Sequence, residues 1–492
     1  MTMQPEASAP TQPLDGPTTS DVRGIEYAAK PGSVDGMESY GWSRTWACAV
    51  MGAAVWLLMF YFGRNISYGG DDFGVIRPGL SGNLLESLHL NIRPLGYLIT
   101  RLSFVTHFQF WLVASLCLYA ATAGGTLRLL LAFGSGNRPA YWQCLLCAVS
   151  PIAAQAYFRL DALTQGLANL STVLFALCVV RCLKETGNDR IRYAAWRAAG
   201  AALLCLLSKE TTYGMILGGG LLLLLRHRRK VALSVALPMV LVFASLLWSA
   251  LRADEFQQGD QYSLRWNPLY WIFTVVFSIG VGLGPIPTSL LLTGSASASV
   301  ELLVLVIAGA ILSLIGIAMY FPRRVCFGSA GAWLRRLGSG NYRPDELLIY
   351  FLLLSLVPSM FLKAAELYAT QALPYAKVLL LRIVPRRTAL TDRLFFGSLC
   401  VMWLLASAVN LMFYSLVLGS DADANINNPS MERWVYAQVG RAVGHRTRDY
   451  SIYDYSSAYI PHQIGGCYVD ARDPDICLPK SIANGVPTWR VP

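Results

Sequence analysis

Charged residues are scarce in this chain. Only 14% of its 492 residues are Asp, Glu, Lys or Arg, while 54% are hydrophobic, and the mean hydropathy is +0.44. Soluble domains carry roughly a quarter charged residues, because their surfaces face water. The shortage of charge therefore excludes an ordinary soluble protein and indicates an integral membrane protein.

Several motifs of energy-dependent and metal-dependent enzymes are also missing. The sequence has no Gly-rich phosphate loop ending in Lys, no dinucleotide fingerprint, no zinc-protease motif and no Gly-x-Ser-x-Gly elbow. Its five His residues show no metal-ligand spacing. We therefore expect no nucleotide site, and any energy-rich substrate should come from the membrane itself.

The charges that are present are mostly positive, with a formal net charge of +11. Nucleic-acid-binding proteins are often basic, but here the Lys and Arg residues stand in short clusters between apolar runs rather than on one soluble face. Such clusters are topology signals in membrane proteins. We expect the lipid bilayer as a partner and no nucleic acid.

Cysteines fall into two groups. Nine of the eleven lie in or beside apolar runs, where Cys is usually a small packing residue. Cys144 and Cys147 form a Cys-x-x-Cys pair, but a redox or zinc role is disfavoured because the pair lies inside an apolar run without nearby partners. Cys467 and Cys477 lie in a hydrophilic tail. If that tail is extracytoplasmic, we expect a disulfide between them.

Long apolar runs dominate the chain between residues 44 and 418, each long enough to cross a hydrocarbon core of ~30 Å as a helix. The runs predict an all-α polytopic membrane protein of about eleven transmembrane helices. These helices are expected at about 44–63, 109–133, 141–157, 163–183, 193–208, 211–225, 231–251, 298–320, 345–361, 367–382 and 393–418.

The loops between these runs differ in charge. Five loops, at 134–140, 184–197, 226–230, 323–343 and 382–393, hold 18 Lys and Arg residues against three acids. By the positive-inside rule these loops are cytoplasmic, so the N-terminus is inside and the C-terminus outside. For a bacterial protein this means the inner membrane, with a periplasmic C-terminus.

Three further segments complete the expected domain organisation. Residues 1–43 are rich in Pro, Gly, Ser, Thr and acids and predict a disordered cytoplasmic tail. The outer loops 64–108 and 252–297 contain amphipathic stretches that should lie on the membrane surface. Within the second loop, residues 269–292 are apolar but broken by Gly and Pro, and we interpret them as re-entrant or interfacial rather than spanning. Residues 419–492 form a small periplasmic segment.

Ionisable residues at the outer ends of apolar helices are functional candidates, because charge is expensive there. Asp71 and Asp72 follow two glycines just beyond the first span. Neighbouring carboxylates hinder each other's ionisation, so one of them could act as a general base or bind a cation. A solvated turn is the alternative for an isolated Asp pair.

Two basic residues could hold a phosphate on the same side. Arg93 precedes Pro94 at the start of an amphipathic stretch, where its guanidinium could grip a phosphate or simply reach the lipid headgroups. Lys209 and Glu210 lie between two apolar runs at the predicted outer boundary. A hairpin turn explains polar residues there, although not charged ones.

Weaker candidates lie near two other outer connections. Lys363, Glu366 and Tyr368 precede the tenth span, and Lys363 and Glu366 would share a helix face and could neutralise one another. Arg159 and Asp161 occupy the tight turn between the third and fourth spans, where a local ion pair is sufficient to explain them.

Taken in order, these motifs resemble the GT-C superfamily of multi-span glycosyltransferases, which use polyprenyl-phosphate or dolichyl-phosphate sugars on the non-cytoplasmic side. Asp71-Asp72 resembles its acidic motif in the first outer loop, and the stretch from Arg93 to Leu98 resembles the Arg-Pro-Leu-x-x-Leu of protein O-mannosyltransferase-like members. Lys209-Glu210 is similar to a later Ser-Lys-Glu motif. The stretch Glu366-Leu367-Tyr368 is similar to a Glu-Arg-x-x-Tyr motif, with Leu where Arg is usual.

The resemblance implies a GT-C-like bundle over residues 44–418 and a transferase that decorates bacterial O-antigen or another surface glycan. The implied partners are a polyprenyl-phosphate sugar donor, a glycan acceptor, and a donor synthase and flippase of the same pathway. Asp71 and Asp72 would be catalytic. Arg93, Lys209, Glu210 and Lys363 would bind the donor phosphate, with Arg159, Asp161, Glu366 and Tyr368 in support. A divalent cation, the sugar and the acceptor stay open.

A transporter or flippase of lipid-linked sugars is the competing interpretation. It would also need many spans, broken helices and charges within the membrane. Such a protein should carry ionisable residues near the middle of the bilayer, whereas the charges singled out above lie at outer helix ends.

Overall fold

The computed structural model describes only part of the chain. It covers residues 34–63, 110–133, 141–150, 154–158, 163–185, 187–227, 342–361, 365–383 and 389–423, with short pieces at 95–96, 98–99, 102, 237–241, 244, 268–269, 271–272, 336–337 and 339. The chain divides into two units, Met1–Trp42 and Ser43–Pro492, and the packing described below lies within the second.

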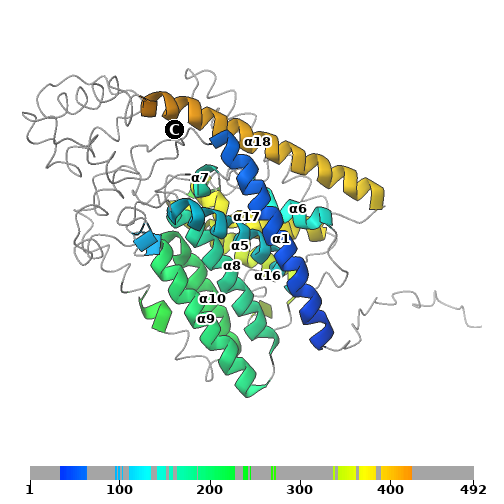
Figure 1. Ribbon diagram of the computed structural model, residues 1–492. Helices are drawn as coiled ribbons and strands as arrows, with labels where there is room; N and C mark the ends of the chain where they lie inside the picture. The colour runs from blue at the N-terminus through cyan, green and yellow to red at the C-terminus, as the bar shows by residue number, and fades with distance from the viewer. Residues whose placement is uncertain are drawn as a thin grey trace, which may run out of the picture. The chain divides into compact units, whose positions relative to one another are not determined.

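Every element in this part of the chain is helical (Figure 1). The elements are α1 (Val34–Gly63), α5 (Phe110–Ala132), α6 (Tyr141–Ala148), α7 (Ala154–Tyr157), α8 (Leu163–Lys184), α9 (Asn188–Ser208), the 3-10 helix η1 (Glu210–Thr212), α10 (Tyr213–His227), α16 (Pro344–Phe361), α17 (Ala365–Ile383) and α18 (Ala389–Asp423).

The expected all-α class is confirmed for these residues, and the membrane character is supported. Among the described helices, three are long and apolar enough to cross a membrane: Trp42–Phe62, Phe110–Ala132 and Leu163–Lys184. The predicted number of about eleven spans stays a prediction, because the predicted span 298–320 and most of 231–251 lie outside the described residues.

The predicted span 141–157 is wrong as a single helix. It consists of two short helices, α6 and α7, with Ser150 and Pro151 between them. A proline lacks a backbone N–H and disfavours helical conformation in the residue before it. The apolar composition of this run concealed the break.

Other helix boundaries also differ from expectation. Helix α1 begins at Val34, so the last part of the predicted disordered tail is helical. Helix α9 begins at Asn188, inside the predicted loop 184–197, and α18 runs from Ala389 to Asp423, beyond the predicted span at both ends. Helices commonly extend past the apolar stretch that crosses the bilayer, and hydropathy alone marks only that stretch.

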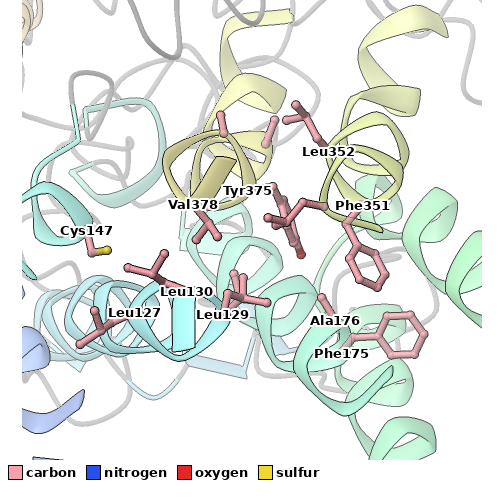
Figure 2. Packing of buried hydrophobic residues seen from close by; sticks show 14 of the residues in the cluster. Leu127, Leu129, Leu130, Cys147, Phe175, Ala176, Phe351, Leu352, Tyr375 and Val378 are labelled. Carbon is pink, nitrogen blue, oxygen red and sulfur yellow. The ribbon is translucent and has the colours of Figure 1, made fainter. Parts of the chain in front are cut away.

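The interior of the bundle is formed where α5, α8, α16 and α17 pack together, with α9 and α10 beside α8 (Figure 1). Figure 2 shows buried apolar side chains from these helices and from α6 facing one another. The labelled residues are Leu127, Leu129, Leu130, Cys147, Phe175, Ala176, Phe351, Leu352, Tyr375 and Val378. In a bilayer this packing stabilises the bundle mainly through dispersion contacts. The hydrophobic effect contributes little there, because lipid tails are as apolar as the core.

A close approach of backbones joins α1 to α5. A Cβ atom at Gly52 would lie 2.9 Å from Cβ of Ala123 and 3.2 Å from Cα of Ala120. Small residues at such contacts let membrane helices pack tightly. Glycine at position 52 is therefore explained by helix packing.

Large apolar side chains remain exposed on the outer surfaces of α1, α9 and α18. Trp46, Trp196 and Leu405 keep 66%, 68% and 61% of their surface accessible. Soluble monomers rarely expose such side chains over whole helices. These surfaces suit contact with lipid tails.

Basic side chains tie several helix ends together. Arg382, in the last turn of α17, pairs with Asp345 in the first turn of α16 at 2.6 Å, and its Nη1 donates to the carbonyl oxygen of Phe133 at 2.6 Å. Lys184 at the end of α8 donates to the carbonyl oxygen of Ala132. Acids near helix starts and bases near helix ends also interact favourably with the helix dipoles.

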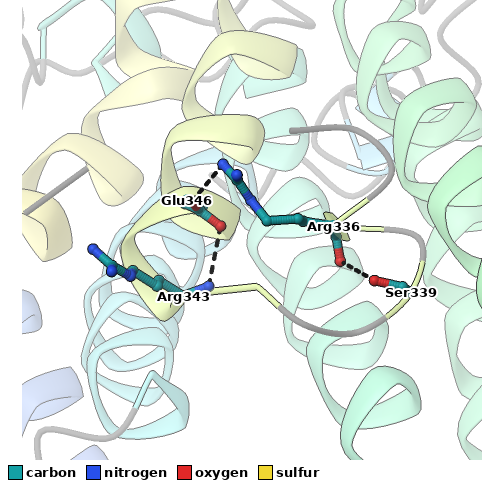
Figure 3. A network of polar contacts seen from close by, with 4 residues as sticks. All are labelled: Arg336, Ser339, Arg343 and Glu346. Atoms are coloured by element: carbon teal, nitrogen blue, oxygen red, sulfur yellow. Dashed lines mark hydrogen bonds and ion pairs between the residues drawn. The ribbon is translucent and has the colours of Figure 1, made fainter. Parts of the chain in front are cut away.

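The segment before α16 joins this arrangement (Figure 3). Arg336 pairs with Glu346 at 3.1 Å, and the backbone N–H of Arg343 donates to the same carboxylate at 3.2 Å. Arg226, in the last turn of α10, donates to the carbonyl oxygen of Ser339 at 2.5 Å. The end of α10 is thereby held beside the start of α16.

We call this side of the bundle the basic end, defined by Phe133, Lys184, His227, Pro344 and Arg382. In the sequence, each of the five basic loops predicted to be cytoplasmic adjoins one of these residues. The starts of α8 and α17 and the end of α9 lie at the opposite side, which we call the far end. That the basic end faces the cytoplasm remains a prediction.

Candidate functional site

The far end brings together parts of three predicted motifs. Gly96, in the stretch that begins with Arg93, is buried, and a Cβ atom there would collide with the Thr164 side chain in the first turn of α8. Leu98 and Leu102 of the same stretch are nearly half exposed, at 44% and 45%. Gly96 thus packs on α8 while Leu98 and Leu102 keep nearly half of their surface accessible, as expected for an amphipathic segment.

Lys209 occupies a sharp corner between α9 and η1. Its backbone is extended, with φ −165° and ψ 146°, and its side chain is only 3% exposed. Thr212 fixes the corner by donating its hydroxyl to the carbonyl oxygens of Cys205 at 2.9 Å and Lys209 at 2.8 Å. Glu210, the next residue, is half-buried. The corner therefore holds a buried cation at the far end in a fixed backbone geometry.

A cluster of neutral polar side chains lies beside this corner. Gln371 of α17 donates to the carbonyl oxygen of Thr211 at 3.2 Å, which ties α17 to η1. The Asn169 Oδ1 atom accepts from Gln165 at 3.0 Å and from Thr370 at 3.2 Å, which ties α8 to α17. We call these five residues the far-end polar cluster.

Three oxygen atoms of this cluster have no hydrogen-bond partner among the described residues. They are Gln165 Oε1, Thr211 Oγ1 and Gln371 Oε1, and all three side chains are 0% exposed. A buried polar atom without a partner costs free energy, roughly 1–3 kcal/mol. These atoms are therefore suited to accept hydrogen bonds from a ligand or from water.

Most of the other predicted site residues cannot be located relative to this end. Glu366 and Tyr368 lie in the first turns of α17, so the backbone brings them to the far end, while their side chains are not described. The residues outside the described part of the chain are Asp71, Asp72, Arg93, Arg159, Asp161, Lys363, Cys467 and Cys477. The geometry of the predicted acidic pair toward Lys209 is consequently untested.

A second polar site lies deeper in the bundle, at the break between α6 and α7. The carbonyl oxygens of Cys147 and Val149 accept from the Lys377 ammonium, the first at 3.1 Å. The neighbouring carbonyl of Ala148 accepts from the Tyr119 hydroxyl at 2.6 Å, and that of Ser150 accepts from Ser407. Helices α5, α17 and α18 thus each provide donors for the broken backbone, as irregular backbone at membrane depth requires.

Lys377 is buried, at 4% exposure, in the middle part of α17. Its Nζ atom also lies 5.6 Å from the ring centroid of Trp403, within cation–π range. The side chain lines a small cavity of about 30 Å³, together with Tyr119, Thr122, Tyr157, Asn169 and other residues. A polar cavity above about 10–15 Å³ can hold a water molecule.

The sequence carries a signal for this site outside the motifs described above. Lys377 is the one charged residue inside the predicted span 367–382 apart from the terminal Arg382, and charges within spans are functional candidates by default. Its partners could not have been found from the sequence, because Cys147 and Val149 lie more than two hundred positions away.

Metal binding finds no support in the described residues, where no group of three or more His, Cys, Asp or Glu side chains could hold an ion. No family model, curated protein or solved structure matches the chain. The resemblance to the GT-C superfamily therefore stays a prediction.

Proposed function

We propose that the protein is an inverting glycosyltransferase that moves a single sugar from a polyprenyl-phosphate carrier to an acceptor glycan on the periplasmic face. O-antigen or another cell-surface polysaccharide is the acceptor class. The observation that carries the proposal is the buried Lys209 at the far end, in a corner that Thr212 fixes and that Gln371 ties to the far-end polar cluster.

The chemistry assigns a role to each charged motif. An acceptor hydroxyl attacks the anomeric carbon, the bond from that carbon to the carrier phosphate breaks, and Asp71 takes the hydroxyl proton as general base. Asp72 orients the acceptor or a cation. The departing polyprenyl phosphate gains negative charge, which Lys209 and Arg93 stabilise in a site shielded from water, and Glu210 orients Lys209.

The far-end polar cluster supports the sugar-binding part of the proposal. Sugars present several hydroxyl groups that donate hydrogen bonds, and Gln165 Oε1 and Gln371 Oε1 are buried acceptors without partners among the described residues. Selective sites commonly use a few placed polar groups in this way. Lys363, Arg159, Asp161, Glu366 and Tyr368 are assigned supporting roles by the resemblance alone.

The test is transfer by the full-length protein in lipid nanodiscs, supplied with radiolabelled polyprenyl-phosphate sugars and candidate acceptor glycans, with and without chelator. Asp71→Asn should abolish transfer, because it removes the base without changing the size of the side chain. Asp15→Asn, in the N-terminal tail, is the matched control and should keep full activity. Substantial transfer by Asp71→Asn would sink the assignment of Asp71.

A transporter of lipid-linked sugars is the second candidate function. It is favoured by Lys377 and the α6–α7 break, because a buried charge beside a broken helix is typical of transport sites. Proteoliposomes without acceptor distinguish the two. A transporter would move a lipid-linked sugar across the bilayer, whereas a transferase would leave it on its original side until an acceptor is added.

A further inference from the structure

The hydroxyl groups that line the cavity beside Lys377 present hydrogen-bond acceptors rather than donors. Tyr119 donates its hydroxyl hydrogen to the carbonyl oxygen of Ala148 at 2.6 Å, Thr122 donates to Leu118 at 2.7 Å, and Thr126 donates to Thr122 at 2.7 Å. A hydroxyl has one hydrogen and two lone pairs. These hydroxyl oxygens therefore keep lone pairs that suit a water molecule beside the Lys377 ammonium.

The Lys377 ammonium has no carboxylate among the titratable groups that face it from the described helices. Those groups are the thiols of Cys48 on α1, Cys147 on α6 and Cys400 on α18. Across the cavity, Tyr119 on α5 and Tyr157 on α7 are the remaining titratable groups. Burying a charge without an opposite charge is expensive, and two carbonyls and an indole ring compensate only in part.

A line of polar side chains leads from the cavity to the far end. Asn169 and Thr370 line the cavity and are hydrogen-bonded to each other at 3.2 Å. Asn169 also accepts from Gln165, one turn closer to the start of α8, and donates to the Tyr157 hydroxyl at 3.2 Å. The cavity is therefore connected by buried polar side chains to Gln165, in the first turn of α8 at the far end.

We propose that Lys377 is a proton-binding site that exchanges its proton with the far face of the membrane through this cavity. The step is Lys–NH₃⁺ giving Lys–NH₂ and one proton, which passes to cavity water and then to the solution at the far end. After proton loss the neutral amine keeps two N–H groups and no charge. Its hydrogen bonds to the carbonyl oxygens of Cys147 and Val149 are then weaker. The site is independent of the glycosyltransferase assignment.

The first experiment is a pH titration of tryptophan fluorescence in the full-length protein, with Trp403→Phe subtracted to isolate the Trp403 signal. We expect that signal to change within the pH range in which the wild-type protein stays folded, because the charge beside the indole ring disappears when Lys377 loses its proton. Lys377→Arg keeps its charge over this range and should be flat. Lys377→Met should also be flat, at the level that the wild type reaches at high pH.

The variant Cys147→Ser, Cys400→Ala removes two of the three thiols that face Lys377. It should retain the pH-dependent change of the Trp403 signal. A wild-type signal that does not change with pH would overturn the proposal. The same would follow from an unchanged titration in both folded Lys377 variants, because another group would then be responsible. Retention of glycosyl transfer has no bearing on either result.

The second experiment tests the route. In oriented proteoliposomes with different pH values on the two sides, the Trp403 signal should follow the pH at the far face. Asn169→Leu should slow that response by about tenfold or more, since it removes the link between the cavity and Gln165, while Asn188→Leu at the basic end serves as an exposed control. A response that follows the pH at the basic end would contradict the proposed route.

Discussion

Lys209 shows how one residue can combine a structural position with a chemical task. Its extended backbone ends α9, and the Thr212 hydroxyl bonds fix the turn that follows. Burial at 3% exposure removes most of the solvent that would screen its charge. A cation held in this way interacts more strongly with a phosphate than a cation on a mobile surface side chain.

Substitution at Lys209 should separate donor binding from folding. Lys209→Gln should lower kcat/KM for the polyprenyl-phosphate sugar by about a hundredfold, because one stabilising charge is lost from the departing phosphate. Lys209→Arg should recover a large part of that loss. The measurements are transfer kinetics and thermal unfolding of both variants in nanodiscs. Equal loss of activity in both variants without a change in unfolding temperature would argue against a charge role.

The residue scale also shows what the sequence could and could not predict. Lys209 and Glu210 were found because charge at the end of an apolar run is conspicuous. Their neighbours Gln165, Asn169 and Gln371 were missed, since neutral polar residues inside apolar runs are common and carry no periodic signal. Their importance depends on contacts between α8, η1 and α17 that only the folded chain provides.

At the scale of elements, α16 and α17 form an antiparallel pair fastened at the basic end. Arg382 there makes two bonds with different partners, Asp345 and the Phe133 carbonyl, so one side chain connects α17 to both α16 and α5. Both charged groups are partly shielded from solvent, at 17% and 24% exposure. We expect such a pair to contribute more to the free energy of unfolding than a fully exposed ion pair does.

A charge-reversal cycle measures that contribution. Asp345→Arg should destabilise the protein by about 1–3 kcal/mol, because it places two cations together at the end of α17. Adding Arg382→Asp should restore part of the loss, through the re-formed pair. Thermal unfolding of the two single variants and the double variant supplies the coupling energy. Additive losses, with no recovery in the double variant, would mean that the pair contributes nothing.

The positions of helices are predicted well where a change in hydropathy marks the helix ends. They are predicted poorly where a local feature of the backbone interrupts an apolar run. The spans corresponding to α5, α8, α16 and α17 were placed within a few residues, because their apolar runs are bounded by charge or proline. The 141–157 span is interrupted at Val149 and Ser150, just before Pro151, since a run of apolar residues looks alike whether or not its backbone is continuous. A proline inside a run does not by itself predict such a break, because Pro358 and Pro374 lie within the continuous helices α16 and α17.

For the whole molecule, the arrangement of the basic loops is the main constraint on topology. The helix ends that adjoin the five basic loops, at Phe133, Lys184, His227, Pro344 and Arg382, lie together at one end of the bundle. The far end correspondingly gathers the starts of α8 and α17 and the end of α9. This shared sidedness was expected from charge alone, whereas the absolute orientation depends on the positive-inside rule.

Cysteine labelling tests the orientation. In a background without reactive cysteines, Asn188→Cys at the basic end should react with a membrane-impermeant maleimide only after the cells are permeabilised. Ala162→Cys, in the predicted outer turn before α8, should react in intact spheroplasts. Reversed labelling of the two positions would place the far end in the cytoplasm and remove the basis for a periplasmic active site.

The proposed proton route would expose Lys377 to the electric field of the membrane. Helix α6, at whose end Lys377 binds, has eight residues, about 12 Å of helix, and is too short to cross a hydrocarbon core of ~30 Å alone. A proton that reaches Lys377 from the far face would cross only part of the transmembrane potential. At 100 mV the full potential is worth about 2.3 kcal/mol per charge. A membrane potential that is negative inside would favour the protonated form of Lys377. It would thereby strengthen the hydrogen bonds that Lys377 makes at the break between α6 and α7.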